Sequence, residues 1–286
     1  MGEHGKHRPL VAALRIMAIC AALGGSVLGA QAQCRQALAL GLDVSRSVDA
    51  QEYRLQLDGL ATALQSEDVR DAILASIETP IALFVYEWSD PTAQRVILPW
   101  TQITGAETLN GVAARLANTT RAGPNDPEFS ADTPGQIGAR TGSTGLGAAM
   151  EYAWYAFRSG PDCWKRTLDI SGDGPNNSGI WPGETHERLA SDRVTVNALV
   201  VAADPMQIGD ARQAEIKELS SYFRSEVILG ADAFVEAALG YVDYQRAMTR
   251  KLLRELQVFA LGELPQLSNG PIRVAERFST TRRVNQ

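Results

Sequence analysis

The sequence predicts an α/β fold, with a doubly wound, mostly parallel sheet, helices on both faces and one antiparallel edge strand. Three observations predict it. Short apolar runs with the composition of buried strands alternate with stretches whose apolar residues recur at helical spacing. The runs at 81–88 and 94–100 are separated by only a short turn, which predicts a hairpin and therefore an antiparallel strand. Pro99, within the second of these runs, is tolerated at the edge of a sheet.

The elements follow in order along the chain. The first strand, 37–42, is apolar throughout and has the length of a buried strand. Asp49 and Glu52 then have the spacing of a capping box, and Tyr53 begins an apolar stripe at helical spacing, which predicts a helix after Asp49. The other expected elements are strands at 81–88, 94–100, 166–171, 194–201 and 226–229, and helices at 105–118, from 144, from 184, at 211–222 and at 241–259.

Residues 1–32 have the pattern of a signal peptide. A polar start precedes an apolar stretch, and Ala30-Gln31-Ala32 matches a cleavage site for export. A membrane anchor is the alternative, but Arg15 interrupts the apolar stretch and favours cleavage. We therefore expect an exported protein that is periplasmic or secreted.

The charge and hydropathy of the chain argue against nucleic acid as a partner and against a membrane span. The formal net charge is −6, and it becomes more negative without residues 1–32, which carry more basic than acidic side chains. We expect no nucleic acid as a partner, because neutralising phosphates requires clustered Lys and Arg. No second apolar stretch is long enough to cross a bilayer, so we expect no membrane span after cleavage. The remaining chain is expected to form one domain at 33–261 and a flexible tail at 262–286.

Cys34 and Cys163 are the two cysteines that follow the expected cleavage site. Each precedes a predicted strand, and each lies nine or ten residues before a motif aspartate, Asp43 or Asp173. If the two strands are parallel neighbours, both sulfur atoms lie at the same end of the sheet. A disulfide is then geometrically reasonable and fits an oxidising compartment. Two unpaired buried thiols are the alternative.

Three polar loops carry candidate ligands for a cation. Asp43, Ser45 and Ser47 come directly after the first strand. Thr144 opens a helix, and Asp173 follows a later strand. Because loops at the carboxyl ends of parallel strands converge on one crevice, we expect these side chains to meet. Their ligand atoms are all oxygens, which suits Mg²⁺ or Mn²⁺.

The same five residues carry a resemblance to a known family. The chain resembles a von Willebrand factor A domain with a metal-ion-dependent adhesion site, whose pattern is D-x-S-x-S, then Thr, then Asp on three successive loops. The resemblance covers about residues 34–259 and implies a Rossmann-like fold. It implies that Ser45, Ser47 and Thr144 bind one divalent cation directly or nearly so. It implies that the two aspartates often act through water, and that an Asp or Glu of a protein partner completes the coordination sphere.

The longer strings SGDGPNN and GYVDYQRAMTRKLLREL resemble an exported bacterial subfamily of unknown function. This closer resemblance implies no activity. We therefore expect a divalent-cation-dependent protein-binding module, that is, an adhesion or interaction module.

Two alternatives remain open: a metal-assisted hydrolase, and a metal-free structural interaction domain of the same fold. Taken singly, short Asp/Ser strings close turns or cap helices. Catalysis is less favoured, because His186 is the one histidine after the expected cleavage site and no G-x-S-x-G motif or phosphate-binding glycine motif is present. We expect no enzyme.

Residues around the third loop are expected to form the partner-binding rim. These are Asn176, Asn177 and Trp181, although Trp181 folding back onto the domain is equally compatible with the sequence. The segment 121–140 is a candidate wall of the site, with a plain solvated loop as the alternative. We expect Asp169 to be paired locally. Four further tryptophans are expected in the core: Trp88, Trp100, Trp154 and Trp164.

Overall fold

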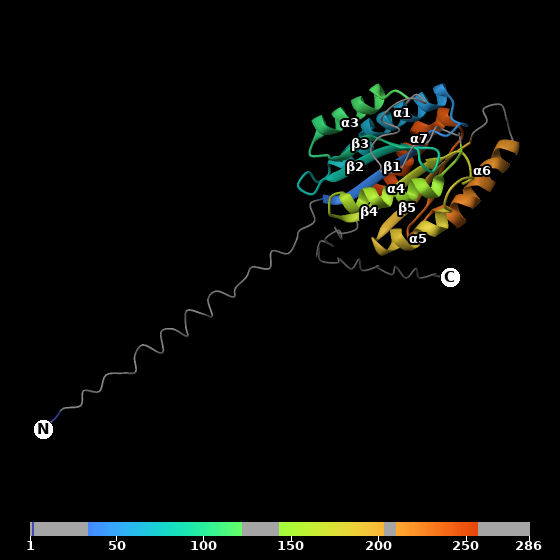
Figure 1. Cartoon of the computed structure of the whole chain (residues 1–286). Helices are drawn as coiled ribbons and strands as arrows, with labels where there is room; N and C mark the ends of the chain where they lie inside the picture. The colour runs from blue at the N-terminus through green and yellow to red at the C-terminus, as the bar shows by residue number, and fades with distance from the viewer. Residues whose placement is uncertain (1, 3–33, 122–142, 203–209, 257–286) are drawn as a thin grey trace, which may run out of the picture.

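The computed structural model describes residues 2, 34–121, 143–202 and 210–256. In this part of the chain six strands form one sheet in the order β3-β2-β1-β4-β5-β6 (Figure 1). They are β1 (Cys34–Asp43), β2 (Ile81–Trp88), β3 (Gln94–Gln102), β4 (Cys163–Gly172), β5 (Val194–Val201) and β6 (Val235–Ala238). Neighbouring strands are parallel except β2 and β3, which are antiparallel. The predicted fold class is confirmed.

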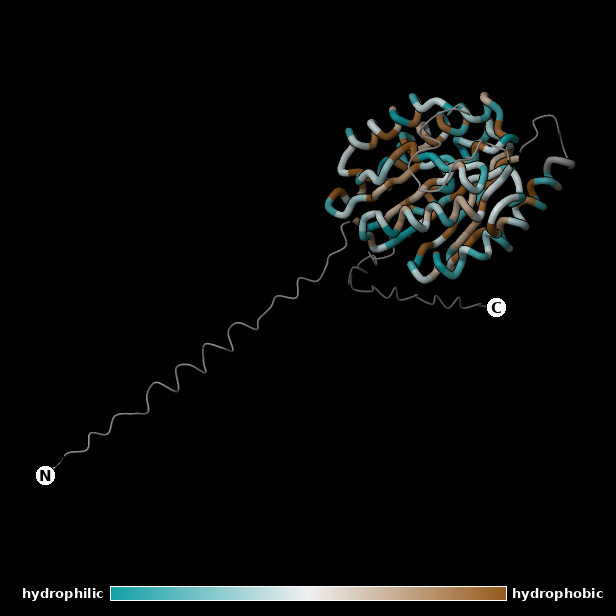
Figure 2. The backbone as a smooth tube through the Cα atoms, viewed as in Figure 1, coloured by the Kyte–Doolittle hydropathy of each residue, from teal (hydrophilic) through white to brown (hydrophobic). Residues whose placement is uncertain are grey.

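Helices cover both faces of the sheet, as Figure 1 shows. On one face lie α1 (Ala50–Gln65), α2 (Glu67–Leu74), α3 (Ala106–Asn118) and α7 (Tyr244–Leu256), whose buried side chains share one core with the sheet. On the other face lie α4 (Leu146–Ser159), α5 (Pro182–Ser191), α6 (Asp210–Tyr222) and the π-helical turn η2 (Phe223–Val227). Hydrophobic residues are concentrated in the central strands (Figure 2). Every residue of β1 and β2 is buried, which explains their nearly continuous apolar composition.

The predicted capping box positions the helix that follows the first polar loop. The Asp49 side chain accepts hydrogen bonds from the backbone N–H groups of Gln51 and Glu52 at 2.7 and 2.8 Å. Glu52 Oε2 accepts a hydrogen bond from the Asp49 backbone N–H at 2.9 Å. This reciprocal pairing satisfies donors that a helix start leaves free, so α1 begins directly after the loop.

One predicted strand is wrong. Residues 226–229 lie in η2 and in the segment after it, where only Leu229 forms an isolated bridge, to Val196 of β5. The sixth strand is instead β6, which follows Gly230, a residue with φ of +117° that turns the chain. A short apolar run gives the same pattern in a buried helical turn as in a strand, so periodicity alone did not separate the two. The short helix α2 was not predicted.

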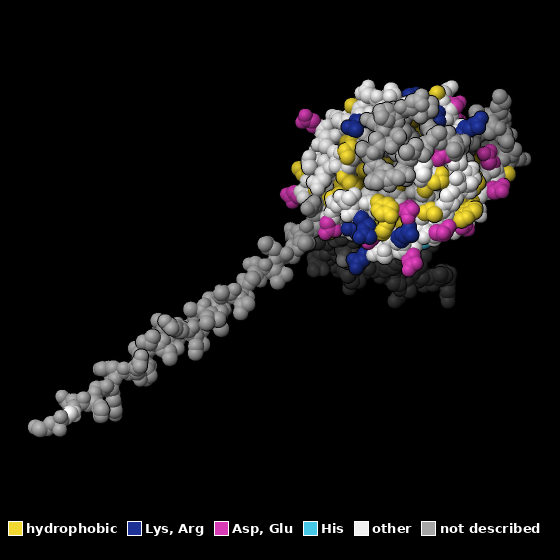
Figure 3. All heavy atoms as spheres, viewed as in Figure 1, with side chains coloured by type: hydrophobic (Ala, Val, Ile, Leu, Met, Phe, Trp, Pro, Cys, Tyr) yellow, Lys and Arg dark blue, Asp and Glu magenta, His cyan; other side chains and the backbone are white. Residues whose placement is uncertain are grey.

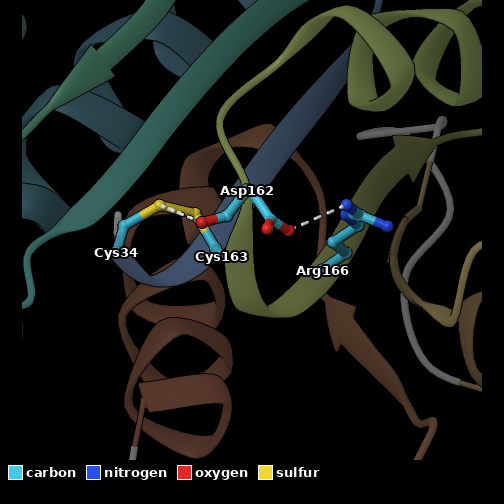
Figure 4. Close-up of a disulfide and its surroundings, with 4 residues drawn as sticks. All are labelled: Cys34, Asp162, Cys163 and Arg166. Carbon is cyan, nitrogen blue, oxygen red and sulfur yellow. Dashed lines mark hydrogen bonds and ion pairs between the residues drawn. A yellow bond between two sulfur atoms is a disulfide. The ribbon is translucent and has the colours of Figure 1, made fainter. Parts of the chain in front are cut away.

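The predicted disulfide is present between Cys34 and Cys163. The two residues are register partners on the neighbouring strands β1 and β4, so their sulfur atoms meet at the end where both strands begin. Figure 4 shows this bond beside Asp162 and Arg166, whose side chains form an ion pair at 3.4 Å. The disulfide therefore lies at the edge of the sheet opposite to the loops that follow β1 and β4.

Apart from residue 2, the predicted signal peptide lies outside the described residues, as do the predicted tail and 122–140 of the predicted wall. Within the described ranges, no helix is long and apolar enough to cross a membrane. On the face drawn in Figure 3, the described Lys and Arg side chains are interspersed with Asp and Glu. Among the described residues visible in this view, the basic side chains do not form one continuous patch.

Candidate metal centre

The first loop folds around the carboxylate that ends β1. Asp43 Oδ1 accepts a hydrogen bond from the Ser45 backbone N–H at 2.7 Å, which closes the loop on itself. The Ser45 and Ser47 hydroxyl oxygens are 3.1 Å apart. One carboxylate and two hydroxyls thus lie together at the carboxyl end of the strand.

The third loop contributes the second carboxylate. The Ser47 hydroxyl donates a hydrogen bond to Asp173 Oδ1 at 2.8 Å, across 126 residues of sequence. Gly172 precedes this aspartate, and a Cβ at that position would lie 3.5 Å from Asp43 Oδ2 and 3.1 Å from the Phe223 ring. The glycine therefore leaves room for the Phe223 ring of η2, whereas the distance to Asp43 would be an ordinary van der Waals contact. The structure brings Asp43, Ser45, Ser47 and Asp173 together.

The backbone of Thr144 is hydrogen-bonded to the third loop. The Thr144 N–H donates to Asn177 Oδ1 at 2.8 Å, and the Asn177 N–H donates to the Thr144 carbonyl oxygen at 3.0 Å. The Gly145 N–H donates to the Ser89 carbonyl oxygen at 2.7 Å, which joins the second loop to the end of β2. Thr144 is buried, with 7% of its surface exposed. The second loop is thus held against the third loop by paired hydrogen bonds.

Asn176 and Asn177 join two loops, a role that the sequence did not suggest. Asn176 Oδ1 accepts a hydrogen bond from the Gly147 N–H at 3.2 Å, and the Asn176 N–H donates to the Tyr222 hydroxyl at 3.1 Å. Asn176 is buried and Asn177 is exposed. Trp181, at the N-cap of α5, has 55% of its surface exposed, so its side chain is available at the surface.

Two carboxylate oxygens in this cluster have unmet hydrogen-bonding capacity. Asp43 Oδ2 and Asp173 Oδ2 are buried, and neither has a hydrogen-bond partner among the described residues. Burial raises the pKa of Asp43 well above its usual range, and repulsion from the Asp173 carboxylate raises it further. Burial also raises the pKa of Asp173, and Glu215 on α6 adds to the rise, whereas the side chains of Ser47 and Tyr241 lower this pKa by stabilising the charged form. Buried carboxylates with free oxygens fit a bound cation, which would compensate their charge.

The composition of the cluster constrains which ion fits. Its potential ligands are two carboxylates and the neighbouring hydroxyls, which suit hard ions such as Mg²⁺ and Mn²⁺. In the described part of the chain, no group of three or more His, Cys, Asp or Glu side chains could hold a metal ion. His186 does not join this cluster; its Nε2 lies 3.3 Å from the Val227 carbonyl oxygen. A histidine- or cysteine-based zinc site is therefore not formed by these residues.

Arg121, the first residue of the candidate wall 121–140, stabilises the first loop, a specific role that sequence reasoning did not assign to it. Its guanidinium group donates to the carbonyl oxygens of Val48 at 2.7 Å, Val44 at 3.2 Å and Ser45 at 3.4 Å. The same group lies over the Tyr53 ring, 5.7 Å from its centroid. No local pattern could have shown this contact, because Arg121 is separated from these residues by more than 65 positions.

Two sequence-based expectations about other polar and aromatic residues need correction. Trp164 is not in the core, since 63% of its surface is exposed near the start of β4, whereas Trp88 is fully buried. Asp169 is not paired locally: its carboxylate lies 2.7 Å from Lys251 Nζ on α7, and both side chains are buried. Both errors arise because strand periodicity does not tell which neighbouring element covers a given side chain.

Comparisons with known proteins give one family and several distant structures. The family described as "Protein of unknown function (DUF1194)" matches residues 33–260. No curated protein matches the chain. Proximal thread matrix protein 1 from the mussel byssus, in crystal form 2, is similar at 12% identity and a TM-score of 0.49 over 79% of this chain and 49% of that protein.

A structure of the same byssus protein with a zinc-occupied MIDAS motif is similar at 14% identity and a TM-score of 0.47, over 79% of this chain and 48% of that one. The pilus adhesin SpaC from Lactobacillus rhamnosus GG, in its open conformation, is similar at 10% identity and a TM-score of 0.47. That alignment covers 79% of this chain and 31% of SpaC. The chain thus spans half or less of these proteins, and so distant a likeness does not identify what it binds.

Proposed function

We propose that this chain, which belongs to the DUF1194 family, is an exported module that binds a protein partner through a divalent cation. Asp43, Ser45, Ser47, Thr144 and Asp173 would hold Mg²⁺ or Mn²⁺. A carboxylate of the partner, from Asp or Glu, would complete the coordination sphere. Export rests on the signal-peptide pattern of residues 1–32 and on the Cys34–Cys163 disulfide.

One observation carries the proposal. Asp43 Oδ2 and Asp173 Oδ2 are buried without hydrogen-bond partners among the described residues, next to the hydroxyls of Ser45 and Ser47. An oxygen-rich cluster with unmet acceptor capacity costs free energy unless a cation compensates it. A cation site thus accounts for both the residue types and their burial.

The charge balance explains why a partner would be needed. Hydroxyl ligands are neutral, and the two aspartates, which together balance the formal charge of a divalent ion, would often act through water, so the ligands in direct contact with the ion would carry little negative charge. An ion held in this way retains attraction for a further anionic oxygen. The bound cation would supply Lewis acidity toward that oxygen. The residues of the chain would fix the position of the ion and limit its access to water.

The first test is calorimetric titration of the purified protein with Mg²⁺ and with Mn²⁺. We expect binding of one ion per chain, and an affinity lower by about tenfold or more in Asp43→Asn and in Asp173→Asn. Asp71→Asn, an exposed residue of α2, is the matched control and should bind as the unchanged protein does. Absence of binding, or equal affinity in Asp43→Asn, would overturn the proposal.

A second measurement addresses the open coordination position. Water-proton relaxation of the Mn²⁺-loaded protein reports whether the ion keeps exchangeable water, and acetate is the simplest probe carboxylate. We expect a relaxation enhancement that acetate reduces. An enhancement that acetate leaves unchanged would contradict completion of the sphere by a carboxylate.

A further inference from the structure

We propose that a cavity beside the candidate metal centre accepts a basic side chain, arginine or lysine, of the bound partner. This inference rests on the proposed function, because the partner carboxylate at the cation is what would place a neighbouring side chain here. The cavity has a volume of about 280 Å³. Its lining residues come from the third loop and from α6 and are Asp173, Pro175, Glu215, Glu218, Leu219 and Tyr222.

The polar part of the lining is anionic. Among the described residues that line the cavity, three are Asp or Glu and none is Lys, Arg or His. Asp173 has 7% of its surface exposed, and its Oδ2 has no hydrogen-bond partner among the described residues. Glu215 Oε2 is also buried and also lacks such a partner in the described ranges. Because the proposed cation would compensate Asp173, the buried unpaired oxygen of Glu215 is the acceptor that remains for a cationic donor, which would satisfy both its charge and its hydrogen bonding.

The rest of the lining is apolar. Pro175, Leu219 and the ring of Tyr222 form this wall, and Leu219 is buried. The Tyr222 hydroxyl accepts a hydrogen bond from the Asn176 N–H at 3.1 Å, which holds the ring in place. Arginine and lysine combine an aliphatic stem with a charged end, so they match an apolar wall that leads to carboxylates.

Size and helical spacing support a single side chain as the occupant. A volume of about 280 Å³ lies just below the range of about 300–1,000 Å³ that is typical of pockets for small organic ligands. Glu215, Glu218 and Tyr222 have spacings of three and four residues on α6 and therefore share one face of the helix. That face meets the third loop at Asp173, which also accepts the hydrogen bond from Ser47. A carboxylate at the metal centre and a cation in the cavity would thus be neighbours in the partner.

The test uses nonapeptides with a central Glu in a Gly/Ser background and one Arg placed at each other position in turn. A matched set carries citrulline, which keeps the shape of Arg without its charge. Binding to the purified protein is measured by calorimetry with Mg²⁺ present. We expect the best Arg peptide to bind about fivefold to tenfold more tightly than its citrulline counterpart.

Variants then assign the preference to the cavity. In Glu215→Gln/Glu218→Gln the Arg and citrulline peptides should bind equally, whereas Mg²⁺ affinity should fall much less than in Asp173→Asn, because Glu215 acts on Asp173 only through its charge. Glu67→Gln/Glu78→Gln removes two exposed carboxylates elsewhere and should keep the preference. Equal binding of both peptides by the unchanged protein would overturn the cavity assignment while leaving Mg²⁺ binding intact.

Two further outcomes would also contradict the cavity assignment. A loss of Mg²⁺ affinity in the double glutamine variant as large as that in Asp173→Asn would assign Glu215 and Glu218 to the metal centre instead. Absence of binding by every Arg peptide, in a protein that does bind Mg²⁺, would show that the cavity takes no lone basic side chain. Failure of Mg²⁺ binding itself would instead overturn the proposed function.

Discussion

Arg121 supports the candidate metal centre without contributing a ligand from its own side chain. Its guanidinium group binds three carbonyl oxygens of the first loop, so it fixes the backbone that carries Ser45 and Ser47. Several hydrogen bonds from one planar group hold a loop more firmly than an ammonium group could. The position of the hydroxyls therefore depends on a residue outside the motif.

We predict that Arg121→Gln lowers the affinity for Mg²⁺ by about tenfold, because outer residues that orient ligands have effects of about 10- to 100-fold. Arg54→Gln is the matched control, since Arg54 lies over the same Tyr53 ring but donates to the carbonyl oxygens of Thr119 and Ala117 instead. Calorimetry gives the affinity, and hydrogen exchange at residues 44–48 reports the loop. Equal effects of the two variants would argue against a specific role for Arg121.

Asp169 forms part of a buried charged cluster away from the metal centre. Lys251 Nζ lies 2.7 Å from its carboxylate and 2.6 Å from Glu255 Oε1, and Asn197 donates to the same Glu255 oxygen at 2.8 Å. Burial raises the pKa of Asp169 to about 7, with Lys251 acting in the opposite direction and Glu255 adding to the rise. Because the folded-state pKa exceeds the usual value of about 4, folding favours the protonated form.

We therefore predict that Asp169 contributes stability that is fully present below about pH 4 and is lost as the pH rises to about 7. Relative to Asp169→Asn, the unchanged protein should lose free energy of unfolding over that interval. Denaturant titrations at several pH values would measure the difference, with Asp71→Asn as the exposed control. A difference that stays constant or rises with pH would refute this assignment.

At the scale of elements, two long apolar strands were predicted with their exact bounds, whereas the fully buried β1 was predicted too short, as 37–42. The predicted strands 81–88 and 194–201 match β2 and β5 residue for residue. Long apolar runs bounded by turns can be buried in few other conformations. The segment 226–229 was wrong, because the buried side chain of Val227 serves a helical turn as well as it would serve a strand. A local pattern of apolar residues predicts the type of an element only where a single backbone conformation can bury those residues.

The disulfide joins two elements, β1 and β4, across a sequence separation of 129 residues. We predict that reducing it lowers the free energy of unfolding by roughly 2–5 kcal/mol, because the cross-link restricts the unfolded chain. Thermal and denaturant unfolding with and without reductant would measure this, and Cys34→Ser/Cys163→Ser should reproduce the reduced state. Unchanged melting with both thiols shown to be free by mass would contradict it.

At the scale of the whole molecule, the candidate ligands of the metal centre could be predicted from the sequence. The residues that hold their loops in place could not. Asp43, Ser45 and Asp173 were foreseeable, because parallel strands deliver their following loops to one edge. Asn177, which joins Thr144 to the third loop, and Arg121 were not, because both act through contacts with residues distant in sequence. Topology can be inferred from the order of elements, whereas such contacts require the packed structure.

The Cys34–Cys163 disulfide also has a mechanical consequence. It cross-links β1 and β4 at the ends where they begin, while the candidate metal centre lies where they end. Tension between a partner held at that centre and the end of the sheet where β1 begins would run along β1 and load its hydrogen bonds to β2 and β4 in shear. Because the disulfide ties the start of β4 to the start of β1, both central strands would bear the tension together.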